Sequence, residues 1–196
     1  MLYFQLQITL LFKGLHKLDK TQDKIIQATR EWVENDDYKN LSMRKLAAKI
    51  GMTTGAIYKY FQNKDELFYQ VSVKLSQKFA EQVITTPEDS AKEELLSLAN
   101  QFCQLSKEQP KITNFLFFNS SLKSFYQNTN HDFEFYDQVM ELVRQVNQKG
   151  ITDQQFFMQI WSFIQGYTLL ILNGVTNYDP ALVERTLDEM IRGSKK

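Results

Sequence analysis

The sequence predicts an all-α protein of about nine helices, and three observations support this fold class. The 196 residues include only three prolines and seven glycines, fewer turn-forming residues than a β-rich chain of this length needs. Apolar residues recur at spacings of three and four along most of the chain, which is the period of an α-helix. No two alternating segments are joined by a short turn, so there is no sign of a β-hairpin. Because 43% of the residues are hydrophobic and 23% are charged, we expect a folded chain with a sizeable core.

Three short helices are predicted between residues 20 and 61. Thr21, Ser42 and Thr53 can each cap the start of a helix, because their hydroxyl oxygens can accept from backbone N–H groups. The first helix should end at residues 35–37, and Gly51 should end the second. The apolar faces of the three helices are Ile25, Ala28, Thr29 and Trp32; Met43, Leu46, Ala47 and Ile50; and Ile57, Tyr60 and Phe61.

Six further helices should follow, and most of them start at a recognisable cap. Residues 63–66 and the pair Ser90 and Glu93 resemble capping boxes, while Thr152 with Gln155 forms another. Asn119-Ser120-Ser121 is a plausible loop. The expected helices are Asp65–Val83, one from Ser90 past Leu105, Ile112–Phe118, Asp132–Lys149 before Gly150, Asp153–Asn173 before Gly174, and Pro180–Arg192.

The stretch Arg44–Thr53 has the composition of a helix-turn-helix. Ala47 is small enough for the next helix to cross closely, and Gly51 permits a left-handed conformation before a tight turn. Met52 can fill the space under the turn, and Thr53 can start the next helix. In this arrangement the second helix, here Thr53–Phe61, enters the major groove of DNA.

The outer face of this predicted unit suits a nucleic acid. The small residues 53–56 let the start of the helix approach DNA, where its free N–H groups and dipole favour a phosphate. Arg44 can reach a guanine edge or a phosphate, and Lys64 can meet the DNA backbone. The side chains expected to point outward are those of Thr54, Tyr58 and Lys59.

Residues 20–68 resemble the DNA-binding domain of the TetR (tetracycline repressor) family. The resemblance rests on the runs 41–47, 51–61 and 63–67 and covers about a quarter of the chain. It implies base or phosphate contacts from Arg44, Thr54, Ala56, Tyr58 and Lys59, and backbone contacts from Ser42, Thr53, Tyr60 and Lys64. With Gly55, these residues form the predicted DNA-binding set. The family often has a basic residue at position 54, so Thr54 removes a charged contact. The alternative interpretation is a three-helix packing unit that binds no nucleic acid.

The rest of the chain resembles the family only in architecture, as a helical domain that binds a ligand and forms a two-fold dimer. We expect a leader over residues 1–17, the DNA-binding domain over 18–66, and an effector-binding and dimerisation domain over 67–196. The helix at 153–173 is apolar nearly all round, which favours burial against both a core and a partner subunit. The alternative is a wholly internal central helix. The predicted dimer interface is Phe157, Trp161, Ile164, Leu182, Leu187 and Met190.

Aromatic residues crowd the middle of the chain, and they suggest either an effector pocket or ordinary core packing. Few charges fall among them, so the expected effector is an apolar or uncharged small molecule. The candidate pocket residues are Phe102, Phe117, Phe118, Tyr126, Phe135, Phe163 and Tyr167. Possible polar contacts come from Asn114, Asn119, Gln165 and Asn173.

Composition and charge narrow the function classes. The formal net charge of zero combines an excess of basic residues up to Asp65 with an acidic excess after it, which places the anion-binding part at the N-terminus. Cys103 is the single cysteine, so no disulfide can form within the chain and a reducing compartment, the cytoplasm, is expected. His16, His131 and Cys103 lack metal-ligand spacing, and no acid, base and nucleophile converge. We therefore expect no metal, no cofactor and no enzyme activity.

Residues 1–12 are mostly apolar and uncharged, but they are too short to span a membrane. They are interpreted as a flexible leader, an upstream start or a non-native addition, with a membrane or partner anchor as the alternative.

The function these features predict is ligand-controlled repression by a homodimer on a palindromic operator. The helix from Asp65 to about Val83 would be the lever between the two domains. An interaction protein that uses the same fold without an effector is the alternative, and the sequence does not distinguish a repressor from an activator.

Overall fold

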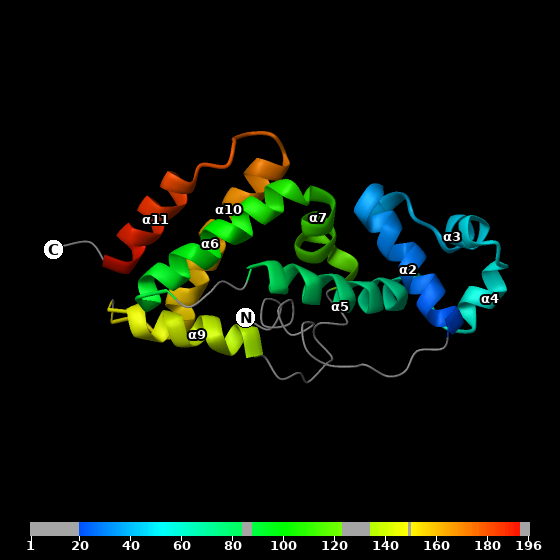
Figure 1. Ribbon diagram of the computed structural model, residues 1–196, viewed down its shortest axis with the longest axis horizontal. Coiled ribbons are helices and arrows are strands. Elements are labelled where there is room, and N and C mark those ends of the chain that lie inside the picture. Colours follow the sequence, from blue (N-terminus) through cyan, green and yellow to red (C-terminus); the bar gives the residue numbers. More distant parts are fainter. Residues whose placement is uncertain (1–19, 84–87, 123–133, 149, 193–196) are drawn as a thin grey trace. The chain divides into compact units, whose positions relative to one another are not determined.

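The computed structural model describes residues 20–83, 88–122, 134–148 and 150–192, and every regular element in these ranges is helical (Figure 1). Nine α-helices and two 3-10 turns lie in the described part of the chain, which confirms the predicted all-α class. In order they are α2 (Lys20–Asn35), η1 (Tyr38–Asn40), α3 (Met43–Ile50), α4 (Thr54–Tyr58), α5 (Lys64–Val83), α6 (Ala91–Glu108), α7 (Pro110–Phe118), η2 (Ser120–Leu122), α9 (Glu134–Val146), α10 (Asp153–Leu172) and α11 (Pro180–Arg192).

The chain divides into two compact units. Unit 1 comprises residues 1–79 and 111–133, and unit 2 comprises residues 80–110 and 134–196. Unit 1 therefore contains α2, η1, α3, α4, most of α5, α7 and η2, whereas unit 2 contains the last turn of α5 with α6, α9, α10 and α11. The predicted domain boundary after residue 66 stays a prediction, and the predicted leader over 1–17 lies outside the described residues.

The core of unit 1 joins the first helices to α5 and α7 through an aromatic cluster. Tyr38 of η1, Phe68 of α5 and Phe115 of α7 meet edge to face, with ring centroids 5.1–5.9 Å apart. All three are buried, and Phe115 is fully so. The fully buried aliphatic residues around the helix-turn-helix are Ile25, Val33, Leu46, Ile57, Leu67 and Val71.

Three lysines tie α2 to its neighbours in unit 1. Lys24 donates to the carbonyl of Ile50 at the end of α3, at 2.9 Å. Lys111 at the start of α7 donates to the carbonyl of Asn35 at the end of α2. Such contacts satisfy carbonyls that have no partner within the helix and place positive charge at the negative end of the helix dipole. Lys74 of α5 forms an ion pair with Asp23 at 3.0 Å.

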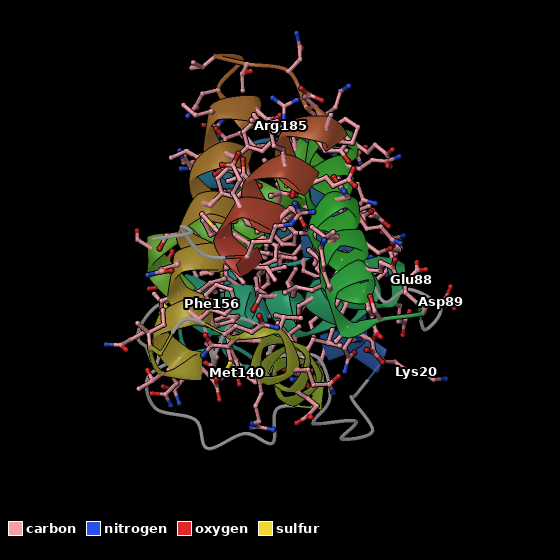
Figure 2. The ribbon with its side chains drawn as sticks, turned by 90° about the vertical axis from the view of Figure 1, so that its left-hand side faces the viewer. Lys20, Glu88, Asp89, Met140, Phe156 and Arg185 are labelled. Carbon is pink, nitrogen blue, oxygen red and sulfur yellow. The ribbon has the colours of Figure 1, made fainter. Side chains whose placement is uncertain are left out.

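Unit 2 is a bundle in which α6 packs against α9, α10 and α11. Its core includes Phe156, which is fully buried, and Met140, labelled on α10 and α9 in Figure 2. Asp188 of α11 pairs with Lys92 of α6 and, at 2.7 Å, with Arg192. The Lys92 hydrogen bond is the main reason why the pKa of Asp188 is lower than usual.

The connection from α10 to α11 is fixed by two tyrosines. The Tyr167 hydroxyl donates to the carbonyl of Asn177 at 2.9 Å and accepts from the backbone N–H of Asp179 at 2.7 Å. The Tyr178 hydroxyl lies 3.1 Å from Oδ1 of Asn100 on α6. The two side chains therefore hold the start of α11 against α10 and α6.

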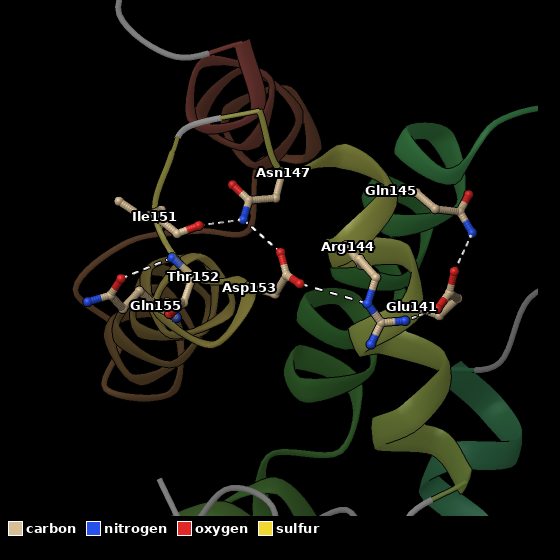
Figure 3. A network of polar contacts seen from close by, with 8 residues as sticks. All are labelled: Glu141, Arg144, Gln145, Asn147, Ile151, Thr152, Asp153 and Gln155. Atoms are coloured by element: carbon tan, nitrogen blue, oxygen red, sulfur yellow. Dashed lines mark hydrogen bonds and ion pairs between the residues drawn. The ribbon is translucent and has the colours of Figure 1, made fainter.

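A polar network closes the turn between α9 and α10 (Figure 3). The Asn147 amide donates to the carbonyl of Ile151 at 2.9 Å and to Oδ1 of Asp153 at 2.8 Å. Arg144 pairs with Glu141 on its own helix and approaches Asp153 at 3.8 Å. The end of α9 is thus bonded directly to the first turn of α10.

Most predicted caps are confirmed, but Thr21 lies inside α2, which already includes Lys20, and two others differ in detail. Thr152 and Gln155 form the predicted reciprocal capping box. Asn63 Oδ1 accepts from the Glu66 N–H at 2.8 Å, but the Glu66 carboxylate accepts from the N–H of Gln62 rather than that of Asn63. The predicted box is therefore shifted, because the chain before α5 turns so that Gln62 presents its N–H to the carboxylate.

At the second box, Ser90 caps the backbone of Glu93 as predicted. The Glu93 carboxylate accepts from the hydroxyl of Ser90 and not, as in a full capping box, from the backbone N–H of Ser90.

Several elements also differ from the prediction. Helix α4 ends at Tyr58 rather than Phe61, α7 begins at Pro110 rather than Ile112, and η2 occupies part of the expected loop at 119–121. The sequence did not indicate η1, which Asp37 caps by accepting from the N–H of Lys39 at 2.9 Å. The helix expected to end at Lys149 ends at Val146, because the Asn147 side chain bonds across the turn to Ile151 and Asp153. Its predicted start, Asp132, lies outside the described residues.

Candidate nucleic-acid interface

The turn between α3 and α4 has the local bonds of a helix-turn-helix. Ser42 caps α3 by accepting from the Lys45 N–H at 3.2 Å, and Thr53 caps α4 by accepting from the Ala56 N–H at 3.2 Å. Gly51 ends α3 with φ of 68°, in the left-handed region that favours glycine. The N–H of Met52 bonds back to the carbonyl of Ala47 at 2.9 Å, which closes the end of α3 in a Schellman-type turn.

The side chains of α4 divide into an inner and an outer face. Ile57 is fully buried and Phe61 is 1% exposed, so these residues anchor the helix to unit 1. Tyr58 is 50% exposed, and Lys59 is also exposed. Thr54 is half-buried, one helical turn before Tyr58. This inward and outward division is the predicted one.

Two cations beside this turn are free of intramolecular polar contacts. Arg44, in the first turn of α3, and Lys59 are exposed, and their side chains have no hydrogen bond or ion pair within the described residues. Lys45 instead donates to the carbonyl of Asn40 at 3.1 Å, and Lys49 lies over the ring of Trp32 at 5.5 Å. Arg44 and Lys59 therefore have the charge available to meet an anion.

Lys64, the first residue of α5, is half-buried, in a less polar environment than the exposed Arg44 and Lys59. Its Nζ lies 4.8 Å from the centroid of the Phe68 ring. Burial lowers the pKa of Lys64, although Asp65 and Asp37 act in the opposite direction. A phosphate close to this ammonium would replace part of the hydration that burial removes.

The predicted DNA-binding residues all lie between Ser42 and Lys64, on α3, the following turn, α4 and the start of α5. Gly55 is exposed, while Ala56 and Tyr60 are half-buried. The prediction omitted Ala48, which is exposed one turn after Arg44 on α3; the i, i+4 spacing could have identified it. Contact of any of these residues with DNA stays a prediction.

The predicted effector residues do not gather in one unit. Phe117 packs edge to face on Phe79 in unit 1, at 5.3 Å, and Phe118 also belongs to that unit. In unit 2, Phe102 packs on Trp161 at 5.3 Å, and Phe163 stacks on Tyr167 at 5.8 Å. Tyr126 and the side chain of Phe135 lie outside what the structure describes.

Polar atoms without partners mark the contact of α6 with α10 in unit 2. Ser106 and Thr168 have no exposed surface. Within the described residues, Ser106 Oγ and Gln165 Nε2 have no hydrogen-bond partner, and Thr168 Oγ1 has none beyond the weak one that the Cys103 thiol offers. Burial raises the pKa of that thiol to about 11. Buried polar atoms without partners are unusual in proteins and suggest that another molecule supplies the missing bonds.

The predicted dimer residues occupy different environments. Phe157, Ile164 and Leu187 are buried in the core of unit 2, while Trp161 and Met190 are half-buried. Leu182 is 39% exposed. Other large apolar side chains exposed on α10 and in the following turn are Met158, Leu169, Leu170 and Val175.

The described residues contain no helix that is long and apolar enough to cross a membrane. The same residues hold no group of three His, Cys, Asp or Glu side chains that could bind a metal ion.

Comparisons with known proteins agree with the helix-turn-helix geometry. Residues 25–71 match the family model described as bacterial regulatory proteins, tetR family. No curated protein sequence matches the chain.

Similar solved structures cover nearly the whole chain at low identity, so they show the fold. One is a putative tetR family transcription regulator from Shewanella sp. PV-4, with a TM-score of 0.64 and 14% identity over 88% of this chain and 96% of that one. Another is the fatty acid degradation regulator FadR from Bacillus halodurans, with a TM-score of 0.58 and 20% identity over 91% and 98% of the two chains. A TetR family regulator from Marinobacter aquaeolei VT8 has a TM-score of 0.60 and 14% identity over 87% and 93%.

Proposed function

We propose that this chain, whose residues 25–71 match the model of the tetR family of bacterial regulatory proteins, is a ligand-responsive repressor of that family. In this proposal a homodimer binds a palindromic operator through α3, α4 and the start of α5. An uncharged effector in the C-terminal part releases the dimer from DNA.

The observation that supports DNA reading most strongly is the outer face of α4. Thr53 and Gly51 fix the turn, Ile57 and Phe61 anchor the helix, and the opposite side is open to solvent. A helix held in this way can enter the major groove, while Arg44 and Lys59 meet base edges or phosphates.

The exposed apolar side chains of unit 2 support a homodimer. Leu169, Leu170 and Leu182 are large apolar side chains that remain exposed on α10 and α11. A two-fold interface would remove them from water, and it would present two copies of α4 to half-sites about one DNA turn apart.

The buried polar atoms of α6 and α10 support an effector that is uncharged and can form hydrogen bonds. Ser106, Gln165 and Thr168 offer hydroxyl and amide groups to such a molecule. None of the fully buried polar residues in the described part of the chain is charged, so an ionic ligand would lack a counter-charge there.

Control of DNA binding then follows from linkage. α5 begins shortly after α4 in unit 1, and its last residues belong to unit 2, so one helix contributes to both units. Suppose that the effector binds better to a conformer in which the two copies of α4 do not match the spacing of the half-sites. The operator affinity then falls by the difference between the effector's binding free energies for the two conformers.

The test is selection of genomic DNA fragments by the purified protein, followed by sequencing of the bound sites and binding measurements at fixed salt. We expect an enriched palindrome. Tyr58→Ala combined with Lys59→Ala should abolish operator binding while leaving the dimer intact, because both side chains are exposed and support no core contact. Absence of an enriched palindrome, or unchanged affinity of the double variant, would refute the proposal.

A further inference from the structure

The reading surface lacks the amide side chains that pair with adenine edges and the carboxylates that pair with cytosine edges. Residues 42–60, which span α3, the turn and α4, include no Asn, Gln, Asp or Glu. Amide side chains read adenine by paired hydrogen bonds, and carboxylates accept from the cytosine amino group. The nearest amides, Asn40, Gln62 and Asn63, lie outside both helices, and the Asn63 side chain caps α5.

What α4 offers to the groove is mainly apolar. Thr54, which is half-buried, and Tyr58, which is exposed, stand one helical turn apart and carry a methyl group and an aromatic ring on the same side of the helix. Gly55 lies between them, and a Cβ atom placed there would meet nothing within 4 Å, so the backbone is open to close approach. The thymine methyl is the one apolar group that base pairs present in the major groove.

Resting on the proposed function, we propose that α4 selects its half-site through thymine methyl groups and that Thr54 is a specificity-determining residue. The methyl of Thr54 contacts one thymine, and the Tyr58 ring contacts a neighbouring step. Adenine edges are not read directly. Arg44, the single arginine in residues 42–60, supplies the guanidinium for a guanine edge.

The inference is tested on the operator selected by the full-length protein. Each thymine of the half-site is replaced in turn by deoxyuridine, which removes only the methyl group. Affinity is then measured by fluorescence anisotropy at one salt concentration. We expect at least one position in each half-site where the loss is about fourfold, the value for one buried methyl-sized group.

Thr54→Ser identifies the partner of that methyl group. It keeps the hydroxyl but removes the side-chain methyl group. Because the same apolar contact is lost, the variant should bind the thymine operator about fourfold more weakly per half-site. At the sensitive position it should not distinguish thymine from uracil. Thr176→Ser is the matched control, because it also loses one methyl but lies exposed in the turn after α10, outside the predicted DNA-binding set, and it should retain the full preference for thymine.

The outcomes separate this inference from the function on which it rests. If no DNA site is enriched, both fail. If a site is enriched but uracil is tolerated throughout, or Thr54→Ser still prefers thymine, DNA reading stands and the thymine inference is overturned. Replacement of adenines by 7-deazaadenine should change affinity less than about twofold, and a loss of roughly tenfold at any adenine would also overturn it, since a bidentate amide contact contributes that much.

Discussion

Cys103 is a buried thiol whose ionisation should limit stability at high pH. The residue has no exposed surface, and burial raises the pKa of its thiol from 9.0 to about 11. Because the folded-state pKa is the higher one, the folded state holds the proton more tightly. The stabilisation is complete below pH 9 and is lost as the pH rises towards 11. The free energy of unfolding should fall by roughly 2–3 kcal/mol over that window.

Urea unfolding at pH 8 and at pH 11 would measure this fall. Cys103→Ala should remove most of it, although the cavity lowers stability at both pH values. Tyr178 contributes in the same direction, because burial raises the pKa of its phenol. The Tyr178→Phe variant is therefore the control that isolates the thiol. An equal fall in Cys103→Ala would contradict the prediction.

Lys64 should contribute to DNA affinity through charge and to the fold through its alkyl chain. Lys64→Met keeps an unbranched chain over Phe68 but removes the ammonium. Operator affinity should fall for all sequences alike, and the slope of log K against log salt should become less negative by about one for each half-site. Thermal stability should stay unchanged or rise, because the partly buried charge is gone. An unchanged salt slope in an anisotropy titration would show that Lys64 meets no phosphate.

The helix-turn-helix contains two glycines with opposite roles, and they form a matched pair for mutation. Gly51 has a φ of 68°, whereas Gly55 lies within α4, and a Cβ would meet no atom within 4 Å at either position. Gly51→Ala should lower the free energy of unfolding by about 1–2 kcal/mol, the cost of a left-handed conformation for an L-residue. Gly55→Ala should raise it by up to about 1 kcal/mol, because alanine favours helix.

For Gly55→Ala, the expected change in operator affinity is opposite to the expected change in stability. Gly55→Ala adds a methyl group on the exposed side of α4 and should weaken operator binding although the protein is more stable. Urea unfolding and anisotropy on the same preparations would measure both properties. Wild-type affinity in Gly55→Ala would mean that the backbone of α4 does not approach DNA closely.

The elements that the sequence predicts well are those decided by neighbouring residues. Ser42, Thr53 and Thr152 cap helices within three residues of themselves, and Gly51 ends α3 by its own conformation, so local pattern was sufficient. The division of α4 into a buried and an exposed side was predictable for the same reason, since one short segment carries it. The hydrogen bonds of the Tyr167 hydroxyl could not be predicted in this way, because its partners in the turn before α11 depend on how that turn folds back.

At the scale of the whole molecule, chain order and spatial grouping differ. α7 follows α6 in sequence but belongs to unit 1, where Phe115 contacts Tyr38 and Phe68. These residues lie far apart along the chain, so no periodicity predicts that they meet. The predicted effector set crossed this division for the same reason: aromatic spacing along a helix indicates a buried face but not the unit that buries it.

Assembly should depend on apolar side chains that the protomer leaves exposed. Leu182 is 39% exposed on α11, whereas Leu187 on the same helix is fully buried. In a two-fold interface each substitution acts twice, and burying a leucine contributes about 1.5–3 kcal/mol. Leu182→Asp should therefore weaken the dimer at least about a hundredfold without unfolding the protomer. Leu187→Ala should instead lower protomer stability by about 2–5 kcal/mol, because it leaves a cavity in the core.

Sedimentation equilibrium across a concentration series, with circular dichroism of the same samples, would distinguish the two effects. The monomeric Leu182→Asp protein should keep its helical spectrum but lose most of its operator affinity, since two half-sites would no longer be bound as one unit. A Leu182→Asp protein that dimerises like the wild type would place the interface elsewhere. A dimer that dissociates without losing operator affinity would contradict the requirement for paired reading helices.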